Sequence, residues 1–164
     1  MRLKLKKFVN VDTSKYSSID HCFKELRRRK IVYSAWIENI YKNKRNKIKI
    51  SKKSYNLYRV KVSSLGFKKA TTLKQIYTKM NRLGLELVNP DVALIARLKF
   101  KNQKIGEWIR FATPLNSMID SDGIPHLPKL GQGLGKLFIE TYWSYPHAIF
   151  HPHNDFVVAK KSDI

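Results

Sequence analysis

At 164 residues, with 43% hydrophobic and 12% aromatic residues, the chain has the size and composition of one globular domain, which excludes a disordered protein. No stretch approaches the roughly 18 apolar residues of a membrane-spanning helix, and the single cysteine, Cys22, favours the reducing cytoplasm because it has no disulfide partner. The formal net charge of +21 is the unusual value, and it makes nucleic acid the expected partner.

The N-terminus is basic and alternates leucine with lysine, at Leu3, Lys4, Leu5 and Lys6. It contains no continuous apolar stretch of the kind found in a secretory signal. We expect either a first strand or a basic arm here.

A first helix is expected over residues 17–30. Ile19, Phe23 and Leu26 recur at helical spacing behind serines that can cap the helix. The last turn consists of Arg27, Arg28, Arg29 and Lys30. Cations suit the C-terminus of a helix, but such a cluster exceeds what the helix dipole needs, so contact with phosphates is an equal interpretation.

A second helix is expected over residues 32–41. Its apolar stripe, Tyr33, Trp36, Ile37 and Ile40, has the spacing of a helix face that packs on the core.

Residues 42–53 form a segment that we call the Lys-rich arm. It contains no acidic residue, and its basic residues are Lys42, Lys44, Arg45, Lys47, Lys49, Lys52 and Lys53. Such a run is typical of a solvated loop. It is also the segment best suited to lie along a phosphate backbone, because cations on mobile tethers adapt to evenly spaced charges. A strand over residues 56–63 is expected to follow.

The charge density falls near residue 64. Residues 1–70 carry 21 basic and 4 acidic residues, net +17, whereas residues 71–164 carry 12 and 8, net +4. A genome-wide bias toward lysine would raise both parts alike, so the uneven distribution favours a polyanion-binding N-terminal part. Compositional drift and an acidic protein partner stay open as alternatives. The division predicts a basic N-terminal part over residues 1–64 and a second unit over residues 65–164.

The second unit is predicted to combine two helices with a mainly antiparallel sheet, so that the whole chain is α+β. One helix begins at Thr71 or Thr72 and ends before Gly84, and a short one begins at Pro90 and ends near Ala96. Strands are expected over residues 85–88, 97–100, 107–112, 137–142 and 156–159, with turns over residues 102–106, 120–123 and 131–135.

Basic and aromatic residues of this unit add possible contacts. Arg97 and Lys99 alternate with apolar residues, which predicts a strand with one basic face. We expect Trp108 in the core. For the aromatic group at residues 142–145, stacking on bases is a fair alternative to burial.

Several motifs of this unit resemble a domain of uncharacterised bacterial proteins. They are Leu83-Gly84-Leu85-Glu86-Leu87, Asn89-Pro90-x-Val92, Arg97-Leu98-x-Phe100-Lys101-x-Gln103-x-x-Gly106-Glu107-Trp108, Asp120-Ser121-Asp122-Gly123-x-Pro125 and Phe156-Val157-Val158. The resemblance covers about residues 65–159. It implies a bacterial source and a self-contained C-terminal unit, and no activity is attached to it.

His151-Pro152-His153-x-Asp155 is the sharpest candidate for chemistry. In an extended segment these side chains share one side, and two imidazoles with a carboxylate suit a transition metal. The set lacks a second ligand cluster, so we expect an exposed turn without metal.

The polar residues that a nuclease would need are also present: Glu107, Asp120, Asp122, His126 and His147. The segment 120–123 is, however, typical of a turn. The glycine-rich segment 131–135 is likewise expected to be a turn and not a phosphate cradle.

These features predict a non-catalytic nucleic-acid-binding protein that grips the phosphate backbone without a cofactor, a metal or a membrane. The predicted contacts are Arg27, Arg28, Arg29, Lys30, Lys42, Lys44, Arg45, Lys47, Lys49, Lys52, Lys53, Arg97 and Lys99. The excess of lysine over arginine favours backbone contact over base reading, and DNA is not distinguished from RNA. The alternatives are a small nuclease or toxin-like ribonuclease, and an interaction module or nucleoprotein subunit that docks on an acidic partner.

Overall fold

The computed structural model describes residues 2–161 and has the predicted α+β architecture. Its strands are β1 (Lys6–Asp12), β2 (Ser54–Lys61), β3 (Thr71–Thr72), β4 (Leu85–Glu86), β5 (Trp108–Phe111), β6 (His126–Gly133), β7 (Lys136–Trp143), β8 (Ile149–Phe150) and β9 (Asp155–Lys160). Its α-helices are α1 (Ile19–Arg28), α2 (Ala35–Lys42), α3 (Leu73–Arg82) and α4 (Pro90–Lys99). Short 3-10 helices are η1 (Thr13–Lys15), η2 (Lys44–Asn46) and η3 (Val62–Leu65).

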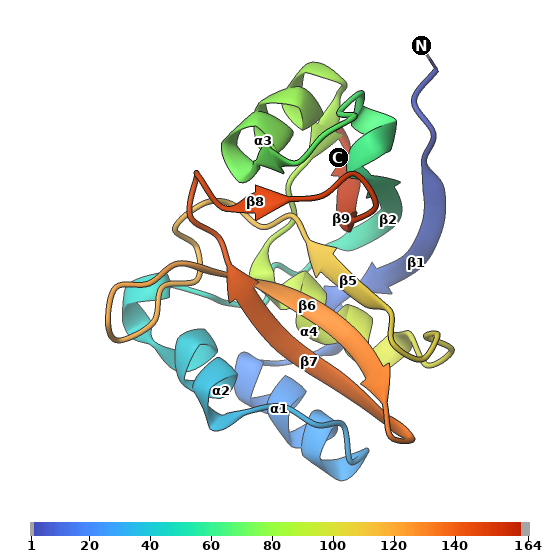
Figure 1. The fold of residues 1–164 in the computed structure, drawn as a ribbon. Coiled ribbons are helices and arrows are strands. Elements are labelled where there is room, and N and C mark those ends of the chain that lie inside the picture. Colours follow the sequence, from blue (N-terminus) through green and yellow to red (C-terminus); the bar gives the residue numbers. More distant parts are fainter. Residues whose placement is uncertain (1, 162–164) are drawn as a thin grey trace.

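The main sheet has seven strands in the order β1-β2-β9-β5-β6-β7, with β4 paired to the end of β9. Its strands pair antiparallel, apart from β5 with β9, which run parallel. β3 and β8 form a separate two-stranded sheet close to α3 (Figure 1). The expectation of a mainly antiparallel sheet is therefore confirmed.

The two faces of the main sheet carry different layers (Figure 1). α1, α2 and α4 pack on one face, where side chains such as Phe23, Ile40 and Leu94 meet Leu130 and Val157 of the sheet. α3 and the β3-β8 pair cover part of the other face through a second buried cluster. Part of that second face, over β5, β6 and β7, has no described helix in front of it (Figure 1).

The predicted division at residue 64 does not separate two folded units. β2, from the N-terminal part, pairs with β9 over Tyr58–Lys61 and Asp155–Val158. The larger buried cluster also draws on both parts, from Val11 to Ala159. Sheet and core thus run continuously across the point where the charge density falls.

Local signals place the ends of two helices as predicted. The Ser18 hydroxyl accepts a hydrogen bond from the amide of His21 at the start of α1. Thr72 and Gln75 form a reciprocal capping box at the start of α3, and Gly84 follows that helix with a φ of +77°. No α-helix within residues 2–161 is long and apolar enough to span a bilayer.

The strand predicted over residues 97–100 is wrong, because this segment is the last part of α4. The helix lies between the sheet and α1, and its residues from Val92 to Leu98 are all buried. A helix buried on every side has no polar stripe, so the short alternation around Leu98 imitates a strand. The helix consequently runs past Ala96 to Lys99.

The second helix begins three residues later than predicted, at Ala35. Val32 instead exchanges backbone hydrogen bonds with Leu137 and Ile139 of β7, and the Ser34 side chain caps the helix. Trp36 is consequently not a core residue: 44% of it is exposed, with its ring edge-on to His126.

β6 occupies a segment in which a turn was predicted at residues 131–135. The strand continues to Gly133, and the turn of the β6-β7 hairpin is confined to Leu134 and Gly135. Both turn residues have a positive φ, of 52° and 72°, as a two-residue hairpin turn requires. By contrast, the turn at residues 120–123 is confirmed, with the Asp120 carboxylate accepting from the amides of Asp122 and Ile124.

Candidate nucleic-acid interface

The cations predicted at the ends of α1 and α2 are balanced by acids, and we call this group the helical cluster. Its ion pairs join Arg27 to Glu38, Arg28 and Arg29 to Glu25, and Lys42 to both Asp20 and Glu38. The hydrogen bond from Arg28 is the main cause that lowers the pKa of Glu25 to about 2. Lys30, one residue beyond the helix cap, forms no ion pair with a described residue. Most of this predicted contact site is therefore internally neutralised.

Hydrogen bonds connect the Lys-rich arm to the rest of the fold. The Asn46 side chain donates to the carbonyls of Ile40 and Ile119 and accepts from the amide of Ile119. Farther along, Ser51 donates two hydrogen bonds to Asp91. The cations Lys42, Lys44, Lys47 and Lys49 line one shallow depression, while Arg45, Lys52 and Lys53 point elsewhere on the exposed surface.

Arg97 is not available as a nucleic-acid contact, because its side chain is 0% exposed. It donates to Gln103 at 2.6 Å and to the carbonyls of Gly131 and Phe138, both at 3.2 Å, and to that of Phe100. Burial lowers the pKa of Arg97 to about 10. The residue thus joins α4 to the sheet.

Lys99 stays on the surface, where its ammonium donates to the Asn10 carbonyl. It lines a cleft of about 560 Å³ together with Arg29, a second predicted contact. The structure therefore distributes the predicted residues over several surfaces instead of one.

The residues considered for metal binding and hydrolysis are distributed over separate places. The rings of His151 and His153 stack with centroids 5.7 Å apart, but Asp155 is bound to Arg59 instead of facing them. Within residues 2–161 there is no cluster of His, Cys, Asp and Glu suited to a metal.

Asp120 and His126 form a buried pair, 2.8 Å apart, and His126 also contacts Thr141. Burial tends to raise the pKa of Asp120, but hydrogen bonds from His126 and two backbone amides outweigh it and lower the pKa. With every polar atom engaged inside the fold, this pair supports the turn at residues 120–123. Asp122 and His147 lie on the surface, and the His147 ring stacks on Tyr145.

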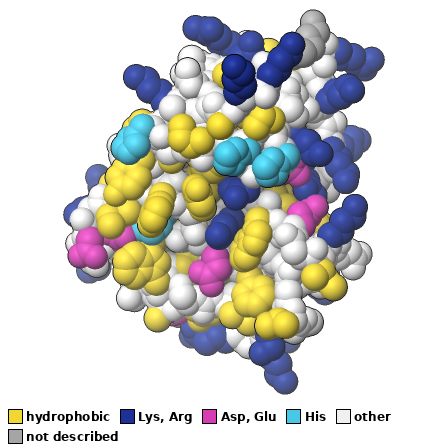
Figure 2. Space-filling view, viewed as in Figure 1, with side chains coloured by type: hydrophobic (Ala, Val, Ile, Leu, Met, Phe, Trp, Pro, Cys, Tyr) yellow, Lys and Arg dark blue, Asp and Glu magenta, His cyan; other side chains and the backbone are white. Residues whose placement is uncertain are grey.

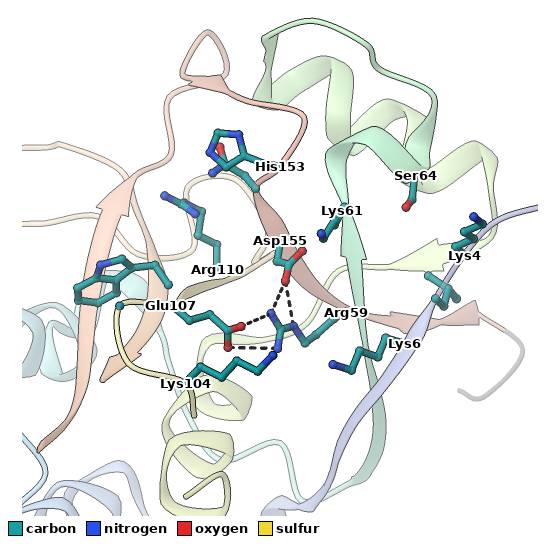
Figure 3. Close-up of a pocket in the computed structure, with 14 residues that line it drawn as sticks. Lys4, Lys6, Arg59, Lys61, Ser64, Lys104, Glu107, Arg110, His153 and Asp155 are labelled. Atoms are coloured by element: carbon teal, nitrogen blue, oxygen red, sulfur yellow. Dashed lines mark hydrogen bonds and ion pairs between the residues drawn. The ribbon is translucent and has the colours of Figure 1, made fainter. Parts of the chain in front are cut away.

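A different cavity, which we call the cationic pocket, has a volume of about 700 Å³ and lies where β1, β2, β9 and β5 meet (Figure 3). Its basic lining residues are Lys4, Lys6, Arg59, Lys61, Lys104 and Arg110. Its acidic lining residues are Glu107 and Asp155, and His153 stands on the rim.

Strand register explains how distant residues converge on this pocket. Lys6 of β1 lies opposite Arg59 of β2, and Lys61 lies opposite Asp155 of β9. β9 begins at Asp155, next to Ile109 of β5, which brings the loop before β5 to the same place. None of the six basic residues was among the predicted contacts.

Arg59 holds both acids of the pocket. Its guanidinium donates to Asp155 from Nε at 3.1 Å and from a terminal nitrogen, and it pairs with Glu107 at 3.1 Å (Figure 3). Burial tends to lower the pKa of Arg59, but the hydrogen bonds to Glu107 and Asp155 outweigh it and raise the pKa. The two carboxylates are thereby committed to one cation.

Among the described residues, the other cations of the pocket form no ion pair, and only Arg110 is close enough to Asp155 to be attracted by that carboxylate. Lys4, Lys6, Lys61, Lys104 and Arg110 form no ion pair with any residue in the range 2–161. Arg110 is half-buried, and its Nε is a buried donor without a hydrogen-bond partner. Burial lowers the pKa of Arg110, which reflects the cost of keeping this charge away from water. The pocket therefore presents a cationic surface that an anion would complement.

Trp108 stands at the edge of the pocket and is 39% exposed, so its predicted place in the core is wrong. Its ring lies over Gly131 of β6, where an added Cβ would come within 2.5 Å of the indole. Gly131 is thus required by a tertiary contact with the neighbouring strand.

Two patterns in the sequence bear on this pocket. Lys4 and Lys6, and likewise Arg59 and Lys61, are spaced by two residues, so each pair shares one side of an extended strand. No local signal in the sequence indicates that these two strands pair with each other, or that the second pairs with the strand that begins at Asp155.

The comparisons with known proteins found no matching family model, no matching curated protein and no matching solved structure.

Proposed function

We propose that this protein binds nucleic acid and that the cationic pocket receives its backbone phosphates. The observation that carries the proposal is the imbalance in the pocket, where six cations face two carboxylates that are both held by Arg59. The backbone of a nucleic acid suits such a surface. Each phosphate that binds a cation of the protein releases counterions to the solvent, and this release favours binding.

The shape of the pocket also suits a phosphate chain. Its cations come from β1 and the segment before it, from β2 and β5, and from the loop that holds Lys104, so they surround the opening instead of forming one row. The lysines are exposed and retain the freedom to follow a chain of phosphates. Arg59, fixed by its two acids, provides a rigid floor (Figure 3).

The test is fluorescence anisotropy with labelled DNA and RNA over a salt series. We expect the logarithm of the affinity to fall linearly with the logarithm of salt concentration. In the variant Lys6→Gln/Lys61→Gln the slope should become shallower by roughly 1.4 to 1.8, since each lost phosphate contact contributes about 0.7 to 0.9.

The matched control is Lys44→Gln/Lys47→Gln in the Lys-rich arm, which removes the same charge from a different surface. An unchanged slope in the control supports the pocket. If the slope changes more in the control than in the pocket variant, the interface lies on the Lys-rich arm. Binding that does not respond to salt would contradict the proposal, and an acidic protein partner would then be sought by purification after nuclease treatment.

RNA cleavage is the second candidate, and one observation favours it: Glu107 and His153 line the same pocket as Arg59 and Arg110. A carboxylate base, an imidazole acid and cations around the phosphate are the groups that metal-free RNA cleavage needs. The samples used for anisotropy are run on a denaturing gel with EDTA present. If the unaltered protein shortens the RNA and Glu107→Gln leaves it intact, RNA cleavage is supported. RNA that stays intact with both proteins supports binding alone.

A further inference from the structure

The uncovered face of β5, β6 and β7 carries Phe138, Glu140 and four further side chains that we call the platform: Trp108, Arg110, Lys129 and Tyr142. The helices α1, α2 and α4 pack on the opposite face of these strands (Figure 1). In Figure 2 this face shows Lys and Arg side chains near its centre, with hydrophobic, His and acidic side chains around them. The platform therefore alternates cations with aromatic rings on an open surface.

The two cations of the platform are direct neighbours. Arg110 of β5 lies opposite Lys129 of β6 in the strand register, and like charges in that position destabilise a sheet. Both are half-buried, and burial is the main cause that lowers the pKa of each. Glu140 lies opposite Lys129 on its other side but forms no ion pair with it among the described residues. An anion that contacts both Arg110 and Lys129 would offset the repulsion between them.

The aromatic rings lie within reach of these cations. The Lys129 ammonium lies 4.4 Å from the centroid of the Trp108 ring, and the Arg110 guanidinium lies 5.2 Å from that of Tyr142. These are cation–π contacts. A phosphate is a stronger partner for Lys129 than the indole is, so an arriving phosphate frees the ring of Trp108 for another planar group.

The platform continues directly into the cationic pocket, because Trp108 and Arg110 belong to both. A chain with a phosphate in the pocket thus meets an indole and then a tyrosine next to further cations. Planar groups between phosphates are the bases of nucleic acid, and only unpaired bases are free to stack on a protein ring.

We infer that the platform binds unpaired bases, so that the protein prefers single-stranded nucleic acid over duplex. This inference rests on the proposed function, since the pocket must first hold the phosphates.

The first experiment uses Trp108 as its own probe. The variant Trp36→Phe/Trp143→Phe keeps only this indole, and oligothymidylate and oligouridylate should quench its fluorescence, whereas a duplex of equal length should not. The reference variant Trp36→Phe/Trp108→Phe keeps only Trp143, which is 61% exposed and follows Tyr142 in β7, so that it faces the other side of the sheet. Its fluorescence should respond equally to single strands and duplex. Quenching of Trp143 alone would overturn the inference.

The second experiment measures affinities by anisotropy. Trp108→Leu should weaken binding to single strands by roughly fivefold or more, the lower limit for one stacked base, and weaken binding to duplex by a smaller factor. Trp143→Leu should change neither. Salt-dependent binding that is equal for single strands and duplex, and unaffected by Trp108→Leu, would overturn the inference while the proposed function stands. Absence of salt-dependent binding to any probe would overturn both.

Discussion

The helical cluster and the cationic pocket are both rich in basic residues, yet they differ in what balances the charge. In the helical cluster Glu25, Glu38 and Asp20 are interleaved with the cations on two adjacent helices, so that Arg27, Arg28, Arg29 and Lys42 each have an acid. In the pocket the two acids share a single arginine, and the remaining cations face the cavity.

The difference teaches that a run of cations in a sequence does not indicate free charge. On a helix, residues three and four positions apart are neighbours, so an acid such as Glu25 reaches the cations of the next turn. At the junction of strands, cations from distant segments meet without the acids that accompany them in the sequence. The availability of charge is therefore a property of the fold.

The largest expected effect concerns stability. Arg59→Met should lower the free energy of unfolding by about 2–4 kcal/mol, because Glu107 and Asp155 would then face each other without a cation in a partly buried site. Arg28→Met breaks an exposed helix pair and should change the free energy of unfolding far less. Urea unfolding compares the two. Equal changes in the free energy of unfolding would show that the ion pairs of the pocket are as exposed to water as those of the helical cluster.

The next prediction concerns affinity for nucleic acid. Glu107→Gln and Glu25→Gln each raise the net charge by one, but only the first acts inside the pocket. Glu107→Gln should tighten binding by roughly two- to fivefold, because it removes one carboxylate that repels the phosphates. Anisotropy at fixed salt measures both. If Glu25→Gln tightens binding as much, total charge and not location controls affinity.

How far the fold was predictable depends on whether a signal is local. Ser18 and Thr72 cap α1 and α3 within their own sequence neighbourhood, and both helices were predicted. β6 was missed because Pro128 and Gly131 are typical of loops. Gly131 is needed because Trp108 lies over it, and that contact comes from another strand.

The candidate site was less predictable than the fold. A basic, phosphate-binding surface is expected from the composition of the chain, and it stays a prediction. Its location does not follow from composition, because Lys6, Arg59 and Asp155 become neighbours only through the register of β1, β2 and β9. Arg97 was predicted to be a surface contact, but its side chain lies buried in the core.

A smaller effect concerns pH and tests whether the helical cluster is paired in solution. The pKa of Glu25 is lowered from 4.5 to about 2, mainly by the hydrogen bond from Arg28. A lowered pKa in the folded state means that this pairing stabilises the protein above pH 4.5 and ceases to do so as the pH falls toward 2. Carboxyl NMR titration should find the low value, and Arg28→Gln should raise it. A midpoint near 4.5 in the unaltered protein would contradict the pairing.

A modest change in stability tests whether the Lys-rich arm is as ordered as the pocket. Lys47 has a φ of 53°, a conformation that costs a side-chain-bearing residue energy and that glycine adopts freely. Lys47→Gly should therefore raise the free energy of unfolding by up to about 1 kcal/mol.

Lys49 supplies the control for this last change, because it is equally exposed and lacks the positive φ. Lys49→Gly should lower the free energy of unfolding by roughly 0.5–1 kcal/mol, since glycine then only adds freedom to the unfolded chain. Opposite signs at these two positions require a backbone held in one conformation. Two changes near zero would mean that the arm moves freely, and its lysines would then be as able as those of the pocket to follow a phosphate chain.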